Sequence, residues 1–240
     1  MTALETFAVL LFAGLIHASF QLSISMLTLL SGHAIGKNAS QSRLSSLTGS
    51  FVIGAVLMTT LVVSFLVYVL LAVSRHNPST FLWAIASGFS LGLSVAVWVF
   101  YYRRQRGTAL WVPRGFARYL SDRTKATHEP AEAFGLGLSS VASEMLFLIA
   151  PLSIAALSIV SLPTSLHLLG LFVYVATASS SLVLVNMLVG SGHKLSGIQK
   201  WREANKRFLQ FIAGSALAVL GFYVYVDHVV SATVLLRGGM

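Results

Sequence analysis

Apolar residues run almost without interruption through six stretches of the chain, and polar or charged connectors separate these stretches. Each stretch reaches the roughly 20 residues that an α-helix needs to cross the hydrocarbon core of a bilayer. The pattern therefore predicts an all-α polytopic membrane protein with six transmembrane helices. Their expected bounds are Phe7–Ser31, Leu47–Ser74, Thr80–Tyr102, Phe134–Ser161, Ser165–Gly190 and Phe208–Val230.

The composition supports a membrane protein and excludes several kinds of chemistry. Hydrophobic residues make up 56% of the 240 positions and charged residues only 10%, whereas soluble domains carry about 25% charged residues. The chain has no cysteine, which excludes disulfides, thiolate metal sites and cysteine redox chemistry. It also has no phosphate-binding loop, zinc signature or spaced nucleophile–base set. No cofactor or metal is expected.

The Lys and Arg residues are concentrated in three of the connectors, and positively charged loops are retained in the cytoplasm. We therefore expect a multi-pass protein of the cell (plasma or inner) membrane, with both termini outside and these three loops cytoplasmic. The basic residues on the cytoplasmic side are Lys37 and Arg43 after the first stretch, Arg103, Arg104, Arg106, Arg114, Arg118, Arg123 and Lys125 after the third, and Lys194, Lys200, Arg202, Lys206 and Arg207 after the fifth, whereas Arg75 and Arg237 fall outside.

The formal net charge of +9 sits mostly beside predicted helix ends. There each basic residue attracts anionic lipid headgroups by about 1 kcal/mol. Nucleic acid is not an expected partner, because no separate basic domain could hold a groove-reading element. Within the longest loop, a helix beginning near Pro113 would place Phe116 and Tyr119 on one face and Arg114 and Arg118 on another, which is typical of a helix lying in the membrane interface.

The long loop divides the chain into two three-helix halves. Residues 1–102 form the first half, residues 103–133 the basic cytoplasmic loop, and residues 134–240 the second half. Because three is an odd number, the first helices of the two halves enter the membrane from opposite sides. Any similarity between the halves must then be of the inverted kind found in secondary transporters.

The two-half layout and the closing passage resemble the lysine-exporter and cytochrome-biogenesis (LysE/CcdA-like) superfamily of small transporters. The closing passage reads Leu195-Ser196-Gly197-Ile198, then Asn205-Lys206-Arg207-Phe208, Gly214 and Val219-Leu220-Gly221-Phe222-Tyr223. The resemblance implies small-solute transport. The chain departs from it in two ways: Gly14-Leu15-Ile16-His17 stands where a Gly-Pro motif is expected, and the paired cysteines of the thiol-transferring branch are missing.

Glu144 is the strongest candidate for a functional residue, because it is the acidic residue placed well inside a predicted span. An ionisable group there costs several kcal/mol unless it is hydrated or paired. Pro151 follows seven positions later, and a mid-span proline removes one backbone hydrogen bond, a device that breaks helices at transporter sites. Glu144 could accept a proton or hold a cationic ligand, or it could be a packing carboxyl that holds helices together.

A polar stripe marks one face of the first predicted helix. Gly14, His17, Gln21 and Ser25 follow one another at spacings of three or four residues, which places them on one side of a helix. The stripe either lines a cavity or joins two helices by hydrogen bonds. Because imidazole titrates near neutral pH, a His17–Glu144 proton relay is one possibility. Asn186, in the fifth stretch, could contribute to the same polar path, as could Ser179-Ser180-Ser181.

Two further patterns concern loops and packing. Ser-Gly-His occurs after the first and fifth stretches, with Lys37 following His33 and Lys194 following His193. Each copy is either a glycine helix cap with a nearby cation or one lip of a cytoplasmic gate. Small residues from Ser87 to Ser94, including Gly88 and Gly92, predict a face for close helix contact.

Three functions follow as hypotheses. The first is a small-solute secondary transporter, expected to be a proton-coupled exporter with a midplane polar cavity around Glu144 and His17. The second is a membrane-embedded lipid-processing enzyme that uses the same two residues near the membrane surface. The third is a non-catalytic membrane partner subunit, in which the polar stripes meet flat helix–helix contacts. The expected partners are a small solute with protons and anionic headgroups, and a homo-oligomer remains open.

Overall fold

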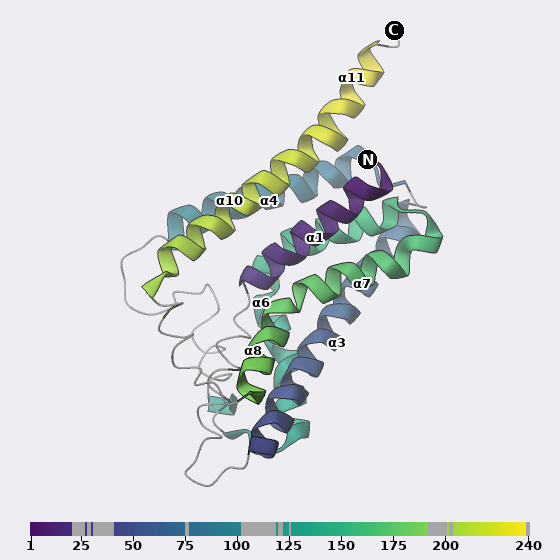
Figure 1. Cartoon of the computed structure of the whole chain (residues 1–240). Coiled ribbons are helices and arrows are strands. Elements are labelled where there is room, and N and C mark those ends of the chain that lie inside the picture. The colour runs from purple at the N-terminus through teal and green to yellow at the C-terminus, as the bar shows by residue number, and fades with distance from the viewer. Residues whose placement is uncertain are drawn as a thin grey trace.

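The computed structural model describes residues 1–20, 27, 30, 41–74, 77–101, 119, 122–124, 126–191, 201 and 204–238. Over these residues the chain is helical and contains no strand (Figure 1). The helices are α1 (Ala3–Phe20), α3 (Gln41–Ser74), α4 (Thr80–Tyr101), α6 (Pro130–Ser161), α7 (His167–Ala178), α8 (Ser180–Gly190), α10 (Lys206–Tyr225) and α11 (Ser231–Gly238), with a 3-10 turn η1 (Thr164–Leu166) before α7 and a π-helical turn η2 (Val226–Val230) before α11.

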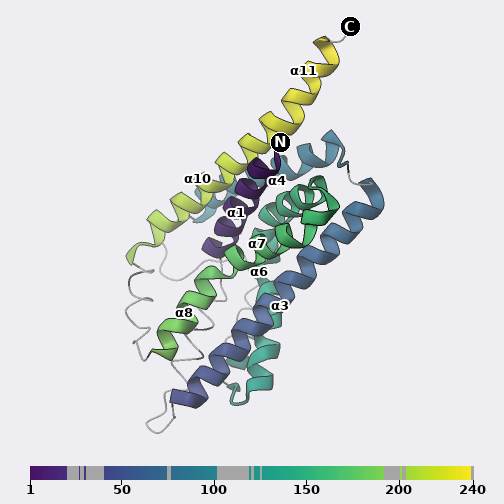
Figure 2. The same ribbon diagram turned by 45° about the vertical axis from the view of Figure 1, so that its right-hand side comes forward.

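Among the described residues, five helices are long and apolar enough to cross a membrane, and a sixth crossing results if α7 and α8 together form one bent span. This indicates a membrane-embedded protein. The N-terminus and the α6–α7 turn lie at one end of the bundle, whereas α6 and α10 begin at the other (Figures 1 and 2).

The helices differ from the predicted ones in three respects. Helices α1, α3 and α6 begin four to six residues earlier than expected, because hydropathy marks the apolar core of a helix and not its polar first turn. The stretch 165–190 is not one straight helix but breaks at Ser179 with a bend of 51°. Conversely, α6 runs without interruption through Pro151, so this proline does not break the helix.

Helix α6 is the central element of the bundle. It packs against α1, α3, α4 and α7. In the most apolar segment of α6, 72% of the residues are buried, whereas the figure for the corresponding segment of α3 is 11%. Its buried positions include many small residues: Ala133, Gly137, Ser140, Ala150, Ala155, Ala156 and Ser158. Small side chains let neighbouring helices approach closely, which is how helices associate where no water is present to drive them together.

Helices α3 and α6 touch backbone to backbone at a pair of glycines. A Cβ atom on Gly54 would collide with the carbonyl oxygen of Phe134, and one on Gly137 would collide with the carbonyl oxygen of Phe51. Since both obstacles are backbone atoms, neither can move aside cheaply. Gly54 and Gly137 therefore fix the depth and register of this crossing, in which the two helices run in the same direction (Figure 2).

Helices α1 and α7 make a second close crossing, also side by side in the same direction (Figures 1 and 2). A Cβ atom on Gly14 would lie 2.8 Å from Cβ of Thr177 and 3.2 Å from the backbone nitrogen of Ala178. On the other helix, a Cβ atom on Gly170 would lie 3.3 Å from Leu10. Gly14 therefore permits the close approach of the two backbones, whereas a Cβ atom on Gly170 would lie nearest to the side chain of Leu162, at 3.0 Å.

Helices α4 and α10 form an antiparallel pair joined by two buried hydrogen bonds. Ser90 Oγ donates to the carbonyl of Leu217 at 2.8 Å, and Ser94 Oγ donates to the carbonyl of Gly214 at 2.7 Å. The predicted small-residue face of this segment is confirmed for Ser87, Ser90 and Ser94, all of which are buried. It is wrong for Gly88 and Gly92, because a Cβ atom on either would meet nothing within 4 Å.

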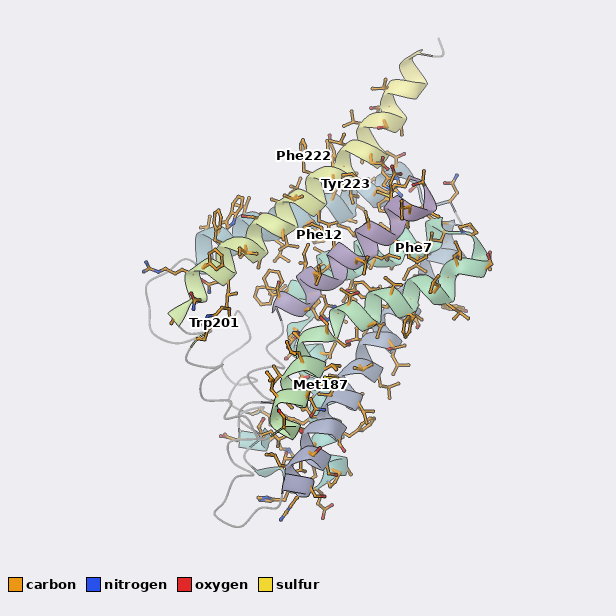
Figure 3. The ribbon with its side chains drawn as sticks, in the orientation of Figure 1. Phe7, Phe12, Met187, Trp201, Phe222 and Tyr223 are labelled. Atoms are coloured by element: carbon orange, nitrogen blue, oxygen red, sulfur yellow. The ribbon has the colours of Figure 1, made fainter. Side chains whose placement is uncertain are left out.

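The outer surface of the bundle is apolar. Large hydrophobic side chains are exposed on every long helix: Phe65 on α3 is 64% exposed, Met187 on α8 64% and Phe222 on α10 64%. Figure 3 places Met187 and Phe222 on their helices among side chains of the outer surface. Such a surface would be unstable in water but matches the hydrocarbon of a bilayer.

We predict that Gly137→Ala destabilises the protein by about 1–3 kcal/mol, the usual cost of forcing an extra methyl group into a packed contact. Gly135→Ala is the matched control, because a Cβ atom there meets nothing within 4 Å and alanine favours the helix. Thermal unfolding in detergent measures both. Equal melting temperatures for the two variants would contradict the backbone contact.

We also predict that Ser94→Ala lowers the stability by roughly 0.6–2 kcal/mol, the range for hydrogen bonds between membrane helices. Ser87→Ala is the control, since Ser87 Oγ bonds within its own helix, to the carbonyl of Ala84 at 3.1 Å. The same unfolding assay applies, and a Ser94 variant as stable as the Ser87 variant would show that the bond to α10 contributes nothing.

Candidate functional site

His17 lies in a helix–helix contact at the centre of the bundle. Its side chain is 1% exposed, and its Nδ1 atom lies 2.8 Å from the hydroxyl oxygen of Tyr174 on α7, which is fully buried. The two rings also meet edge to face, with centroids 5.8 Å apart. The imidazole thus belongs to the α1–α7 crossing, one turn from Gly14.

The contact continues along α1 towards its C-terminal end. Ser181 Oγ donates a hydrogen bond to the carbonyl of Ala18 at 3.1 Å, which joins α8 to α1. One further step along, the rings of Phe20 and Phe147 stack with centroids 5.9 Å apart, which joins α1 to α6. The described part of the predicted polar stripe therefore packs against other helices.

Glu144 lies within α6 and is 2% exposed. Ser140 precedes it by one turn and is fully buried, with its hydroxyl bonded to the carbonyl of Gly137 at 2.7 Å. Phe147 follows Glu144 by about one turn. The carboxyl group therefore sits between the backbone contact of α6 with α3 and the aromatic contact of α6 with α1.

His17 and Glu144 lie on opposite sides of the Phe20–Phe147 stack. Helices α1 and α6 run in opposite directions (Figures 1 and 2), and each residue precedes its phenylalanine by three positions. At about 1.5 Å per residue, the two are offset by about 9 Å along the helix axes. A proton moving between them would need an intermediate carrier.

Asn186 lies farther along α8 and is half-buried. Its Oδ1 atom is buried and has no hydrogen-bond partner among the described residues. An amide oxygen left in this state costs free energy unless water or a ligand completes it. The structure thus leaves Asn186 as a candidate for the polar path.

An open groove lies between α3 and the bent pair α7–α8, with a volume of about 810 Å³. Of the residues expected on the polar path, it includes Ser179 and Ser180 but not Asn186, and it includes neither His17 nor Glu144. Sequence reasoning missed it, although Ser179-Ser180-Ser181 marks the bend where it forms. Its lining residues are Val56, Thr60, Leu168, Leu171, Phe172, Val175, Ala176, Ser179, Ser180, Val183, Leu184 and Met187.

The remaining predicted site residues lie outside the described part of the chain. These are Gln21, Ser25, His33, Lys37, His193 and Lys194, and most of the predicted interfacial helix lies there too. Within the described ranges, no group of three or more His, Asp or Glu side chains could hold a metal ion.

A separate aromatic cluster occupies the end of the bundle that holds the N-terminus. The rings of Trp83 on α4 and His228 in η2 stack at a centroid distance of 3.7 Å. Asp227 lies 3.6 Å from the His228 ring nitrogen Nε2. His228 thus joins η2 to the start of α4.

The chain matches no known family, no curated protein and no solved structure. Its function must therefore be inferred from its own residues.

We predict that Tyr174→Phe destabilises the protein by about 1 kcal/mol, because it leaves the buried His17 Nδ1 atom without its partner. Tyr68→Phe serves as the control, since Tyr68 is 70% exposed on α3. A double-mutant cycle with His17→Phe isolates the pair. Additive effects of the two substitutions would mean that the hydrogen bond contributes nothing.

Proposed function

We propose that the protein is a small secondary transporter built from two inverted three-helix halves, and that it exports its solute in exchange for protons. In this arrangement α7 and α8 form one bent span, so that the chain crosses the membrane six times. Both termini lie outside, and the basic loops face the cytoplasm and anionic headgroups. Glu144 carries the proton.

The observation that carries the proposal is the pairing of the helices. Exchanging the halves takes α1 to α6, α3 to α7–α8 and α4 to α10. If each helix is replaced by its counterpart in the other half, the parallel α3–α6 pair becomes the parallel α7–α1 pair, which is also in contact. The pairs α1–α6 and α4–α10 each consist of two counterparts, so they map onto themselves. An internal two-fold relation between the halves accounts for this pattern, and inverted repeats of this kind are common in secondary transporters.

A single shift in residue number relates the two close crossings. A shift of 123 residues takes Gly14 to Gly137, Phe51 to Tyr174 and Ala55 to Ala178. Each of these residues lies at one of the crossings, and the aromatic pair is fully buried. In the sequence, the same shift takes Gln21 to Glu144.

The broken span supports transport as well. In transporters of this kind, discontinuous helices at the interface between repeats form the binding site, because they can bend and expose polar backbone. By the shift of 123 residues, Ser179 at the break corresponds to Val56 in the first half, where α3 continues without a break. In this proposal the two halves share a framework and differ at the bend at Ser179.

A buried carboxyl at this place is suited to carry a proton. In hydrocarbon its charged form is costly, so Glu144 would be neutral while sealed and would release its proton where the bundle opens to water. His17 supplies a polar group on α1, which packs against α6, and Asn186 supplies another on α8. Rocking one half against the other would expose Glu144 alternately to the two sides.

The non-catalytic partner subunit is the second candidate, and one observation favours it. The described part of the α1 stripe meets other helices, through His17 with Tyr174 and Ala18 with Ser181. A scaffold would need no more than that. Among the described residues nothing favours the lipid-processing enzyme, because His17 and Glu144 are both buried and are offset by about 9 Å along the helix axes.

Proteoliposomes loaded with a pH-sensitive dye test the proposal. We predict that at least one of a panel of small amino acids, organic cations and amphiphiles drives proton movement, and that Glu144→Gln abolishes it because an amide cannot take up a proton. Asp122→Asn is the control, since Asp122 is an exposed carboxyl in the loop. Unchanged coupling in the Glu144 variant would remove its role, and no solute-driven movement in the native chain would favour the scaffold.

A further inference from the structure

We propose that the groove between α3 and the bent α7–α8 pair binds the hydrocarbon chain of an amphipathic molecule that enters sideways from the membrane. The inference deepens the proposed function and rests on it in one respect: if the protein is a transporter, its solute carries an apolar tail.

The groove extends along most of the bent α7–α8 span and lies against the middle of α3. Val56 and Thr60 lie near the middle of the 34-residue α3, and the opposite wall is formed on both sides of the α7–α8 break. Leu168, Phe172 and Met187 are exposed at its rim, at 80%, 69% and 64%. The medium that reaches the groove is therefore lipid hydrocarbon and not water.

The groove also lies on the internal two-fold relation between the halves. The shift of 123 residues takes Val56 to Ser179 and Thr60 to Val183, and all four residues line the groove. Inverted-repeat transporters bind their substrates near the midplane at the interface between repeats. The groove lies between helices of the two halves and against the middle of α3, as such a binding site would.

The chemistry of the lining selects the class of occupant. It contains no charged residue, and its polar side chains are the hydroxyls of Thr60, Ser179 and Ser180. Thr60 Oγ1 is already bonded to the carbonyl of Val56 at 2.8 Å. An ion or a polar solute would lose its hydrogen bonds to water there and would gain few from the lining, which is unfavourable. A hydrocarbon chain makes no hydrogen bonds with water and so has no such cost.

The size and shape of the groove favour a chain over a second protein. Its volume of about 810 Å³ lies within the roughly 300–1,000 Å³ of small-molecule sites. It is a hollow at a helix break, whereas a second copy would have to insert a helix about 10–12 Å wide. A hydrocarbon chain is thinner than a helix and can lie along the lining of the groove.

Photolabelling with a diazirine-bearing fatty acid in phosphatidylcholine vesicles tests the site. We expect saturable labelling concentrated on peptides that contain Val56 and residues 168–187, with competition by unlabelled fatty acid. Ala176→Trp fills the groove and should lower this labelling at least about fivefold, the factor given by a steric penalty of about 1 kcal/mol. Ala142→Trp, at an exposed position of α6, should leave it unchanged.

Two outcomes would overturn the site: labelling spread evenly over the outer surface and unaffected by Ala176→Trp, or protection of the groove by a second copy of the chain in cross-linking. The flux assay separates the two proposals. Groove labelling without solute-driven proton movement would refute the transporter and leave the tail site standing. Transport of polar solutes with no groove labelling would refute the tail site alone.

Discussion

The backbone contact between Gly54 on α3 and Gly137 on α6 is the constraint on which the rest of the structure depends. In a membrane no hydrophobic effect drives one helix against another, so helices associate through close packing and a few hydrogen bonds. Side chains at these two positions would collide with opposing carbonyl groups. Bringing α3 this close places α6 at the centre of the bundle and leaves room around it for α1, α4 and α7.

A glycine also permits a close helix crossing at Gly14, where α1 meets α7, and buried polar side chains lie beside this crossing. His17 and Tyr174 lie beside the crossing, and Glu144 lies beside the equivalent crossing of α6. The two halves differ where three consecutive serines begin at Ser179 and the span bends. In the proposed transporter, the two halves would share this framework and move about the bent element, and the apolar groove at the bend would hold the tail of the solute.

The sequence predicted the helical fold because hydropathy records burial in hydrocarbon directly. It also identified Glu144 and His17 as buried polar groups. It could not predict their partners, since hydrogen bonds such as that of His17 to Tyr174 join positions 157 residues apart. The break at Ser179 escaped prediction because serine is tolerated inside membrane helices. Conversely, α6 continues through Pro151 without a break, because a membrane helix tolerates proline where neighbouring groups satisfy the freed backbone.

Inversion of the two halves is the central claim, and membrane topology tests it most directly. The native chain has no cysteine, so single cysteines can be placed at Asn77, Thr164, Ala126 and Ser191 and treated with a membrane-impermeant maleimide. Inverted halves predict labelling of positions 77 and 164 on intact cells and of positions 126 and 191 only after permeabilisation. Labelling of positions 77 and 191 from the same side would contradict it.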